Sequence, residues 1–361
     1  MTAVVATVHP ESLVDPDAKQ TLLSNSPASS LVDQFGRHKH KLRISLTDRC
    51  NFRCSYCMPD QPDWLAKKDI LSFEELLKFA SVMVGMGIRH IRLTGGEPLM
   101  RQGVVHFIQS LSELKKQGLQ RISMTTNAYY LKKYARDLKQ AGLDDLNISL
   151  DSVNASTFLK MTQRPLKPVQ DGIQAAVDAD IPVKLNCVIV AGQNAHEIVE
   201  LTQWAYQHNL PLRFIEYMPL DAPSNWQADK VITEDQIIGN LAPYFRIEKQ
   251  QRLNDPATIY QLSPLFPHES ATLKSPFELG IISTISKPFC QTCDRLRLTA
   301  TGELFTCLFA NSGTAIRPLL QQANSALLQQ VILQAVWHKK AGFIAQQQAP
   351  VRKISMHAMG G

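Results

Sequence analysis

The chain has 361 residues, 44% of them hydrophobic and 19% charged, so it can bury a large core and form one large domain with a smaller one. Its net charge of +6 permits an anionic substrate, but the lack of basic runs and interleaved aromatic residues argues against a nucleic-acid-binding protein. No apolar run approaches the roughly 20 residues that a membrane helix needs, so we expect no membrane partner.

Residues 1–30 are expected to form a flexible lead that is dispensable for chemistry, because they are rich in serine and show no sustained periodicity. The apolar stretch after Met1 is short and lacks the basic start of a signal peptide. Glu11, Asp15 and Asp17 argue against an organelle transit peptide. Cysteines that act as metal thiolates suit a reducing compartment, so we expect a cytoplasmic protein.

Three cysteines follow the first predicted strand, residues 42–46, with the spacing C-x3-C-x2-C; this first triad is Cys50, Cys54 and Cys57. Iron–sulfur clusters normally take four cysteine ligands, so three leave one iron open to a small molecule. Structural zinc also uses closely spaced cysteines, but it needs a fourth ligand, and neither His38 nor His40 has the usual spacing. Local spacing therefore favours a cluster and leaves zinc as the alternative.

Strand and helix patterns alternate after the first triad. Ser72 and Glu75 form a capping box that predicts a helix to about Val84. Further strands are predicted at 88–94, 121–125, 146–150, 183–190 and 212–217. Helices are predicted at 103–117, 129–140 and 195–208, and helical stretches follow the strand at 146–150 up to about residue 179. Six such units predict a parallel sheet forming an open, partial (βα)6 TIM-like barrel in an α/β fold.

Polar residues follow four consecutive predicted strands. They are the first triad, Thr94-Gly95-Gly96-Glu97-Pro98, Thr125-Thr126-Asn127 and Ser149-Leu150-Asp151. Each group alone would be read as a cap or a turn. Because catalytic groups gather at the carboxyl ends of parallel barrel strands, four such groups predict one site. We expect the glycine pair to let backbone approach a ligand closely.

The alternation of strand and helix patterns ends near Thr233. A short helix begins there, and residues 245–248 and 258–261 have strand patterns, whereas residues 262–278 follow no pattern that we can align. We expect residues 233–361 to form a small C-terminal α+β layer across the open side of the barrel formed by residues 31–232. This layer would carry a second cluster and exclude water from a radical intermediate.

A second triad, Cys290, Cys293 and Cys307, lies in this region and is again one ligand short of a zinc site. Two incomplete triads predict two clusters. Arg295 and Arg297 follow at alternate positions of a probable strand, which suits forked recognition of phosphate. The seventh cysteine, Cys187, lies in a strand pattern and is expected to pack in the core.

Together these motifs resemble the radical S-adenosylmethionine superfamily and, within it, the GTP 3′,8-cyclase family, whose enzymes perform the first step of molybdenum cofactor biosynthesis. The resemblance runs from about Leu31 to Gly361. It rests on T-D-R-C-N-F-R-C-S-Y-C-M-P, L-T-G-G-E-P-L, C-Q-T-C-D-R-L-R-L and the terminal Gly360-Gly361. One departure is Ala128, which stands where many members have the glycine of T-T-N-G.

The resemblance implies a role for each matching residue. The two triads would each hold a 4Fe–4S cluster, the first binding S-adenosylmethionine and the second meeting the guanine of GTP. The residues matched to contacts with S-adenosylmethionine are Tyr56, Gly96, Ser149 and Met218. Those matched to the nucleotide are Arg43, Arg92, Thr125, Lys184, Arg213, Arg295 and Arg297, with Arg43, Arg295 and Arg297 as catalytic residues. The terminal glycines would enter the active-site cavity.

The implied reaction begins with reductive cleavage of S-adenosylmethionine and joins ribose C3′ of GTP to guanine C8, giving (8S)-3′,8-cyclo-7,8-dihydroguanosine 5′-triphosphate. The implied partners are an electron donor such as flavodoxin or ferredoxin and a downstream cyclic pyranopterin monophosphate synthase; a homodimer is compatible with the sequence. Two alternatives stay open at this point. One is a peptide-modifying radical enzyme with an auxiliary cluster, and the other is a non-enzymatic protein with two zinc modules.

Overall fold

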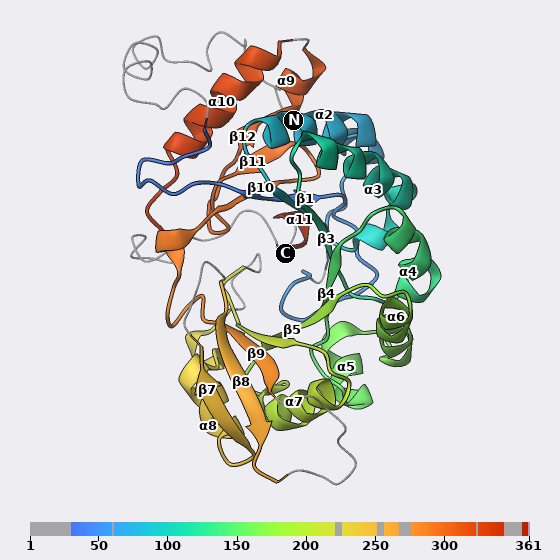
Figure 1. The fold of residues 1–361 in the computed structure, drawn as a ribbon, viewed down its shortest axis with the longest axis vertical. Helices are drawn as coiled ribbons and strands as arrows, with labels where there is room; N and C mark the ends of the chain where they lie inside the picture. Colours follow the sequence, from blue (N-terminus) through green and yellow to red (C-terminus); the bar gives the residue numbers. More distant parts are fainter. Residues whose placement is uncertain are drawn as a thin grey trace, which may run out of the picture.

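The computed structural model describes residues 30–59, 61–220, 226–250, 256–266, 276–322, 324–342 and 356–359. Their strands form one twelve-stranded sheet in the order β12-β11-β10-β1-β2-β3-β4-β5-β6-β9-β8-β7. The sheet curves around the centre of the molecule, with α2 to α7 along its outer side (Figure 1). No helix among these residues is long and apolar enough to cross a membrane.

Six parallel strands form the middle of the sheet and confirm the predicted ones, each boundary within two residues. They are β1 (Lys41–Ser45), β2 (His90–Thr94), β3 (Arg121–Thr126), β4 (Asp145–Ser149), β5 (Val183–Ile189) and β6 (Leu212–Glu216). The helices between them are α2 (Phe73–Gly85), α3 (Val104–Ser112), α4 (Leu131–Gln140), α5 (Ala155–Thr162), α6 (Lys167–Asp178) and α7 (Ile198–Gln207). Short 3-10 segments lie at Lys67–Asp69, Pro98–Met100, Glu113–Gln117 and Ala195–Glu197.

The predicted capping box at the start of α2 is present. Ser72 Oγ accepts a hydrogen bond from Glu75 N at 3.1 Å, and Glu75 Oε2 accepts one from Ser72 N at 2.8 Å. The helix then buries Leu76, Phe79 and Met83 against the sheet. A local sequence signal and the hydrophobic period thus agree on where this helix begins and which face it buries.

The C-terminal strands differ from the prediction, because they extend both edges of the same sheet and do not form a separate layer across the barrel. Strand β9 (Phe277–Ile282) pairs in parallel with β6, and β10 (Arg295–Leu298) pairs in parallel with β1. Eight strands are therefore parallel. The predicted α/β partial barrel is confirmed, but its two outer parallel strands come from residues for which we had predicted another layer.

Antiparallel strands and the remaining helices complete the fold. Beyond β9 lie β8 (Thr258–Pro264) and β7 (Phe245–Lys249), and beyond β10 lie β11 (Glu303–Phe305) and β12 (Thr314–Ala315). The helices are α8 (Glu234–Leu241), α9 (Arg317–Gln321), α10 (Ser325–Trp337) and α11 (Met356–Met359), with 3-10 turns at Ala228–Lys230 and Cys290–Thr292. Residues 1–29 of the predicted lead (1–30), residues 267–275 of the unaligned stretch (262–278) and Gly360-Gly361 lie outside the described residues.

Alternating residues give the parallel strands one apolar and one polar face. In β1, Leu42 and Ile44 are fully buried in the core, whereas Lys41 and Arg43 line an internal cavity. Strand side chains alternate between the two faces of a sheet, so the outer face packs on the helices and the inner face is left for polar groups. This alternation directs the functional side chains toward the centre of the barrel.

Ala128, the departure noted in the sequence, has a φ of +60°, in the left-handed region that favours glycine. An L-residue there costs about 1–2 kcal/mol. We therefore expect Ala128→Gly to raise the free energy of unfolding by about 1 kcal/mol, partly offset by the greater entropy of glycine in the unfolded chain. A higher midpoint of urea unfolding would show this.

The matched control is Gly172 on α6. A Cβ added at Gly172 would come within 2.1 Å of the carbonyl oxygen of Ala128, which is backbone and has little freedom to move. Gly172→Ala should therefore lower the urea midpoint. An Ala128→Gly variant no more stable than the original protein would show that the strain at this turn is already relieved.

Candidate functional site

A cavity of about 440 Å³ lies inside the curved sheet. This volume is within the range of roughly 300–1,000 Å³ that is typical of small-molecule sites. All seventeen site residues predicted from the sequence line it: both triads, the four residues matched to S-adenosylmethionine and the seven matched to the nucleotide. The structure thus brings them together, whereas the ligand that each one contacts stays a prediction.

The first triad lies in the loop that follows β1. Backbone hydrogen bonds from Cys57 N and Met58 N to the carbonyl oxygen of Cys54, at 3.0 and 2.9 Å, tighten the loop around its cysteines. Phe52 N donates to the sulfur of Cys50 at 3.4 Å. The three thiols form no disulfide, are half-buried and line the cavity.

The glycine pair after β2 lies against this loop. Gly96 N donates to Thr47 O at 2.7 Å, and a Cβ added at Gly96 would come within 2.3 Å of Arg49 O. Gly95 has a φ of +151°, and its added Cβ would come within 2.6 Å of Thr47 O. We had expected the glycines to admit a ligand. Although both line the cavity, their closest packing partner is the backbone of the cysteine loop.

Glu97 joins the ends of three strands. Its carboxylate accepts hydrogen bonds from Leu99 N at 3.0 Å and from Thr126 Oγ1 and Asn127 N at 2.7 Å each. Burial raises the pKa of Glu97 to about 7. Asn127 in turn donates to Asn51 Oδ1 at 2.9 Å, so the polar groups after β2 and β3 hold the cysteine loop in place.

Asp151, after β4, holds the aromatic residue of the first triad. Tyr56 donates its hydroxyl to Asp151 Oδ2 at 2.7 Å, and Asp151 Oδ1 accepts a hydrogen bond from Val188 N at 3.0 Å. Burial raises the pKa of Asp151 to about 6. Burial, together with the nearby charge of Asp151, also raises the pKa of Cys54 well above its usual value.

The second triad lies on the other side of the cavity. Cys290 and Cys293 bracket the turn before β10, and Cys307 follows β11. Burial acts to raise the pKa of Cys293, but the cations Lys339, Arg295 and Lys39 together with a backbone hydrogen bond from Arg295 outweigh it and lower that pKa to about 7. The surroundings of Cys293 therefore favour its thiolate.

Strand register places five basic side chains next to one another, here called the basic wall. Arg43 on β1 is aligned with Arg297 on β10 and with Arg92 on β2, and Lys41 is aligned with Arg295. Burial and the charges of Arg297, Arg92 and Arg295 lower the pKa of Arg43 well below its usual value. Like charges held this close are costly unless an anion lies among them, so the basic wall can bind a polyanion.

Several lining residues were missed by the sequence reasoning. Asn147 Oδ1 and Asn186 Oδ1 are buried in the cavity wall, and neither has a hydrogen-bond partner among the described residues. Buried polar atoms usually have a partner, so these two can accept hydrogen bonds from a ligand. Lys41, His90 and Arg121 also line the cavity. The signal that could have found them is their even spacing from predicted site residues on the same strands, which is four residues for Arg121 and two for the others.

The C-terminal helix α11 also reaches the cavity. Met356 and His357 are among its lining residues. His357 packs edge-on against Trp64 with a 5.8 Å separation of ring centroids, and Arg53 lies 5.0 Å above the ring of Trp64. In Figure 1 the helix lies inside the curve of the sheet. The chain therefore returns to the cysteine loop just before its last two residues.

The arrangement of the cysteines suits clusters. Among the described residues no three His, Cys, Asp or Glu side chains converge on a position that could hold one metal ion. In a 4Fe–4S cluster each cysteine binds a different iron, so three ligands need not converge on one point. Each triad supplies three thiols, none of them in a disulfide, to a cavity large enough for further ligands. The donor sets therefore fit clusters that each leave one iron for another ligand.

Comparison with known proteins yields two matches to protein families. Residues 44–205 match the Radical SAM superfamily, and residues 210–344 match the Molybdenum Cofactor Synthesis C family. The first match covers the end of β1, the first triad and β2 to β5. The second covers β6 to α10, including the second triad and its arginines.

Curated relatives match most of the chain. A GTP 3′,8-cyclase of Streptomyces coelicolor is 38% identical over 327 residues, covering 88% of this chain and 92% of the relative. One of Geobacter sulfurreducens is 37% identical over 346 residues, covering 92% and 99%. Among solved structures, Streptococcus suis SuiB has a TM-score of 0.55 at 10% identity over 82% of this chain and 67% of its own, a likeness of fold alone.

Proposed function

This chain belongs to the GTP 3′,8-cyclase family of the radical S-adenosylmethionine superfamily, and from that premise we propose that it converts GTP to (8S)-3′,8-cyclo-7,8-dihydroguanosine 5′-triphosphate. This conversion is the first step of molybdenum cofactor biosynthesis. The observation that carries the proposal is that both triads and the basic wall line one cavity. One ligand can therefore touch groups that are far apart in the sequence.

Membership of the superfamily implies a 4Fe–4S cluster and S-adenosylmethionine. We propose that the first triad holds this cluster and that the second triad holds another. When bound, the first cluster and S-adenosylmethionine supply the one-electron chemistry that removes hydrogen from the substrate. The protein contributes binding, orientation and a shielded cavity.

The residues near the first triad orient S-adenosylmethionine in this proposal. The Tyr56 ring is held by Asp151, and Gly96 presents backbone without a side chain beside the cysteine loop. Ser149 at the end of β4 and Met218 after β6 complete this part of the lining. All four lie on rigid strand ends or on segments hydrogen-bonded to them, which keeps the cofactor in one position relative to the substrate.

The basic wall binds the triphosphate in this proposal, with Thr125, Lys184 and Arg213 on the neighbouring strands. Lys184 lies 3.9 Å from Glu278, and Arg92 lies 3.9 Å from Asp145, so both cations stand at the cavity with a carboxylate nearby. Arg295 and Arg297 come two and four residues after Cys293 of the second triad. They would place the phosphates so that the guanine reaches the second cluster.

The test is anaerobic incubation of the iron-loaded protein with GTP, S-adenosylmethionine and dithionite. We expect 5′-deoxyadenosine, methionine and the cyclised nucleotide, and no comparable product from ATP. In Arg295→Ala and Arg297→Ala, loss of a charge-assisted phosphate contact costs about 1.5–3 kcal/mol. This cost is roughly ten- to a hundredfold in GTP affinity by calorimetry.

Iron content should stay unchanged in both arginine variants. Arg136→Ala on α4, which removes an exposed arginine outside the cavity lining, should bind GTP normally. Wild-type GTP affinity in both arginine variants would contradict the role of the pair. Cleavage of S-adenosylmethionine without any cyclised nucleotide from the unaltered protein would contradict the proposed reaction and favour the peptide-modifying alternative.

The proposed reaction also implies partners. It needs an external electron, for which we propose a flavodoxin or a ferredoxin, and its product must be consumed, for which we propose a cyclic pyranopterin monophosphate synthase. We further propose a cytoplasmic location and a homodimer. Along the chain, residues 31–232 would form the barrel that binds and cleaves S-adenosylmethionine, and residues 233–361 would hold the second cluster. Both parts would contribute side chains to the substrate site.

A further inference from the structure

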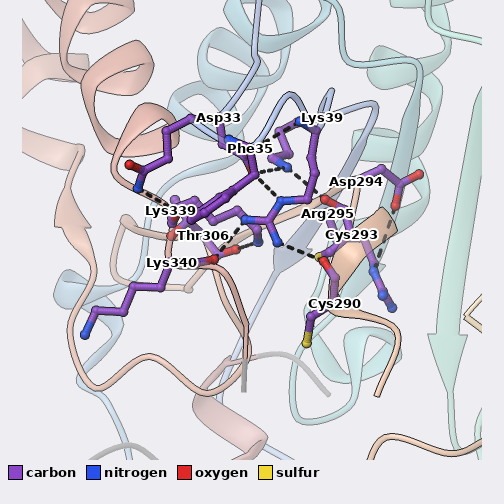
Figure 2. A network of polar contacts seen from close by, with 12 residues as sticks. Asp33, Phe35, Lys39, Cys290, Cys293, Asp294, Arg295, Thr306, Lys339 and Lys340 are labelled. Atoms are coloured by element: carbon purple, nitrogen blue, oxygen red, sulfur yellow. Dashed lines mark hydrogen bonds and ion pairs between the residues drawn. The ribbon is translucent and has the colours of Figure 1, made fainter. Parts of the chain in front are cut away.

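Three cations, all buried, each donate a hydrogen bond to backbone beside one cysteine of the second triad (Figure 2). Each cysteine of that triad is therefore tied to a positive charge within one residue of its own position. The contacts are Arg37 Nη1 to Cys290 O at 2.8 Å, Lys39 Nζ to Cys293 O at 2.8 Å, and Lys339 Nζ to Thr306 O, the residue before Cys307.

One carboxylate organises two of these cations. Asp33 Oδ2 lies 2.7 Å from both Arg37 Nε and Lys39 Nζ, and Asp33, Arg37, Lys39 and Lys339 are all buried. We call these four residues the basic cradle. Three cations against one carboxylate leave a formal charge of +2. Buried charges are costly, so a pair of positive charges that has no further carboxylate among its hydrogen bonds and ion pairs in the described residues indicates a nearby anionic group.

The basic cradle connects three parts of the chain that are far apart in the sequence: the segment before β1, the turn at Cys290–Thr292 and the segment after α10. Arg37 also donates to the carbonyl oxygens of Lys340 and Ala341, at 2.8 and 2.6 Å. Beyond them, a Cβ added at Gly342 would come within 2.7 Å of the sulfur of Cys290. The segment before β1 and the segment after α10 are therefore both fastened to the second triad.

The first triad has more acidic surroundings, although one exposed cation, Arg164, donates Nε to Asn51 O at 2.6 Å. Two buried carboxylates lie close to this triad: Asp151 accepts the hydroxyl hydrogen bond of Tyr56 at 2.7 Å, and Glu97 accepts one from Asn127 N, whose side chain lies 3.8 Å from the sulfur of Cys50. The cation Arg53 also interacts with Cys50, with the opposite sign to Glu97, so the charges around the first triad are not all negative. The contrast remains: two buried carboxylates face the first triad, and three buried cations with one carboxylate hold the second.

We propose that the basic cradle makes the cluster of the second triad easier to reduce than the cluster of the first; this rests on the two-cluster function proposed above. Reduction adds one electron from the external reductant to a 4Fe–4S cluster, changing its charge state from 2+ to 1+, and breaks no bond. Cations held in low-dielectric surroundings stabilise that added negative charge, and buried carboxylates oppose it. The electron therefore rests preferentially on the substrate side of the cavity.

The first test compares the two clusters in proteins that keep only one triad. One variant replaces Cys50, Cys54 and Cys57 by Ala, and the other replaces Cys290, Cys293 and Cys307. Redox titration followed by electron paramagnetic resonance, without S-adenosylmethionine or GTP, gives one midpoint potential for each. We expect the higher potential for the protein that keeps the second triad. Equal or reversed potentials would overturn the proposal.

The second test removes charge from the cradle in the protein that keeps only the second triad. In Lys39→Met and Lys339→Met, we expect the reduced-to-oxidised ratio at a fixed poise to fall about tenfold, which corresponds to 59 mV for a one-electron couple. Lys340→Met removes the same charge from the next residue, whose side chain is exposed, and should leave the potential unchanged. Lys39→Arg and Lys339→Arg keep the positive charge, so they should show the original midpoint potential.

Iron and sulfide analysis distinguishes a failure of this redox proposal from a failure of the two-cluster function on which it rests. Methionine variants that retain iron but keep the original potential would overturn the role of the cradle. If the protein that keeps only the second triad binds no iron, the second cluster itself is contradicted, whatever the charge of the cradle. A purely structural role for Lys39 and Lys339 would change iron retention without moving the potential.

Discussion

Replacing the first triad by alanine is expected to abolish reductive cleavage of S-adenosylmethionine, whereas replacing the second is expected to spare some cleavage and stop cyclisation of GTP. The two triads line the same cavity but have different neighbours. The glycine pair and Tyr56 lie beside the first, and Arg295 and Arg297 follow the second. Loss of either triad should therefore remove a different step of one reaction.

The measurement is the yield of 5′-deoxyadenosine and of cyclised nucleotide from each triple variant, with dithionite as the reductant. The matched control is Cys187→Ala. Cys187 is fully buried on β5, as predicted, and does not line the cavity. It should therefore keep both products. Full cyclase activity in either triple variant would contradict the two-cluster proposal.

Deleting Gly360 and Gly361 is expected to remove most cyclisation while leaving iron content and GTP binding intact. Both glycines lie outside the described residues, but the preceding helix α11 is placed at the cavity by Met356 and His357. Two glycines that continue from this helix can approach a bound nucleotide closely, because their backbone carries no side chain. The effect should therefore fall on the chemical step more than on binding.

The comparison is product formation by this truncation and by a second one that lacks residues 1–28. The second deletion stops short of Asp33 and the basic cradle and should change activity little. If the protein without Gly360 and Gly361 is fully active, these two glycines have no role in cyclisation, as is common for residues at chain ends. Loss of GTP binding in the tail deletion would indicate a role in assembling the cavity.

The sequence predicted the middle of the fold well, because its signals are local. The capping box at Ser72, the hydrophobic period of α2 and the apolar alternation of β1 depend on residues a few positions apart. The spacing within the first triad is also a local property. Its resemblance to a known family identified the superfamily, which the family match confirms.

The sequence did not predict where the C-terminal strands pair. Strands β9 and β10 have ordinary strand patterns, but their partners β6 and β1 lie far away in the chain, and pairing over such distances has no local signal. The expectation of a separate layer failed for this reason. It could not be corrected from periodicity, which gives the type of an element and not its neighbour.

By itself, the sequence determined the strand–helix alternation of the barrel and the family to which the chain belongs, and it identified the two cysteine triads as candidate ligand sets. Only the tertiary structure decided that Arg297, Arg43 and Arg92 stand side by side, since the register between β10, β1 and β2 creates that row. Only the tertiary structure decided that Lys39 and Lys339, from opposite ends of the described chain, flank one triad. Electrostatic surroundings depend on distance in space, and a sequence records only distance along the chain.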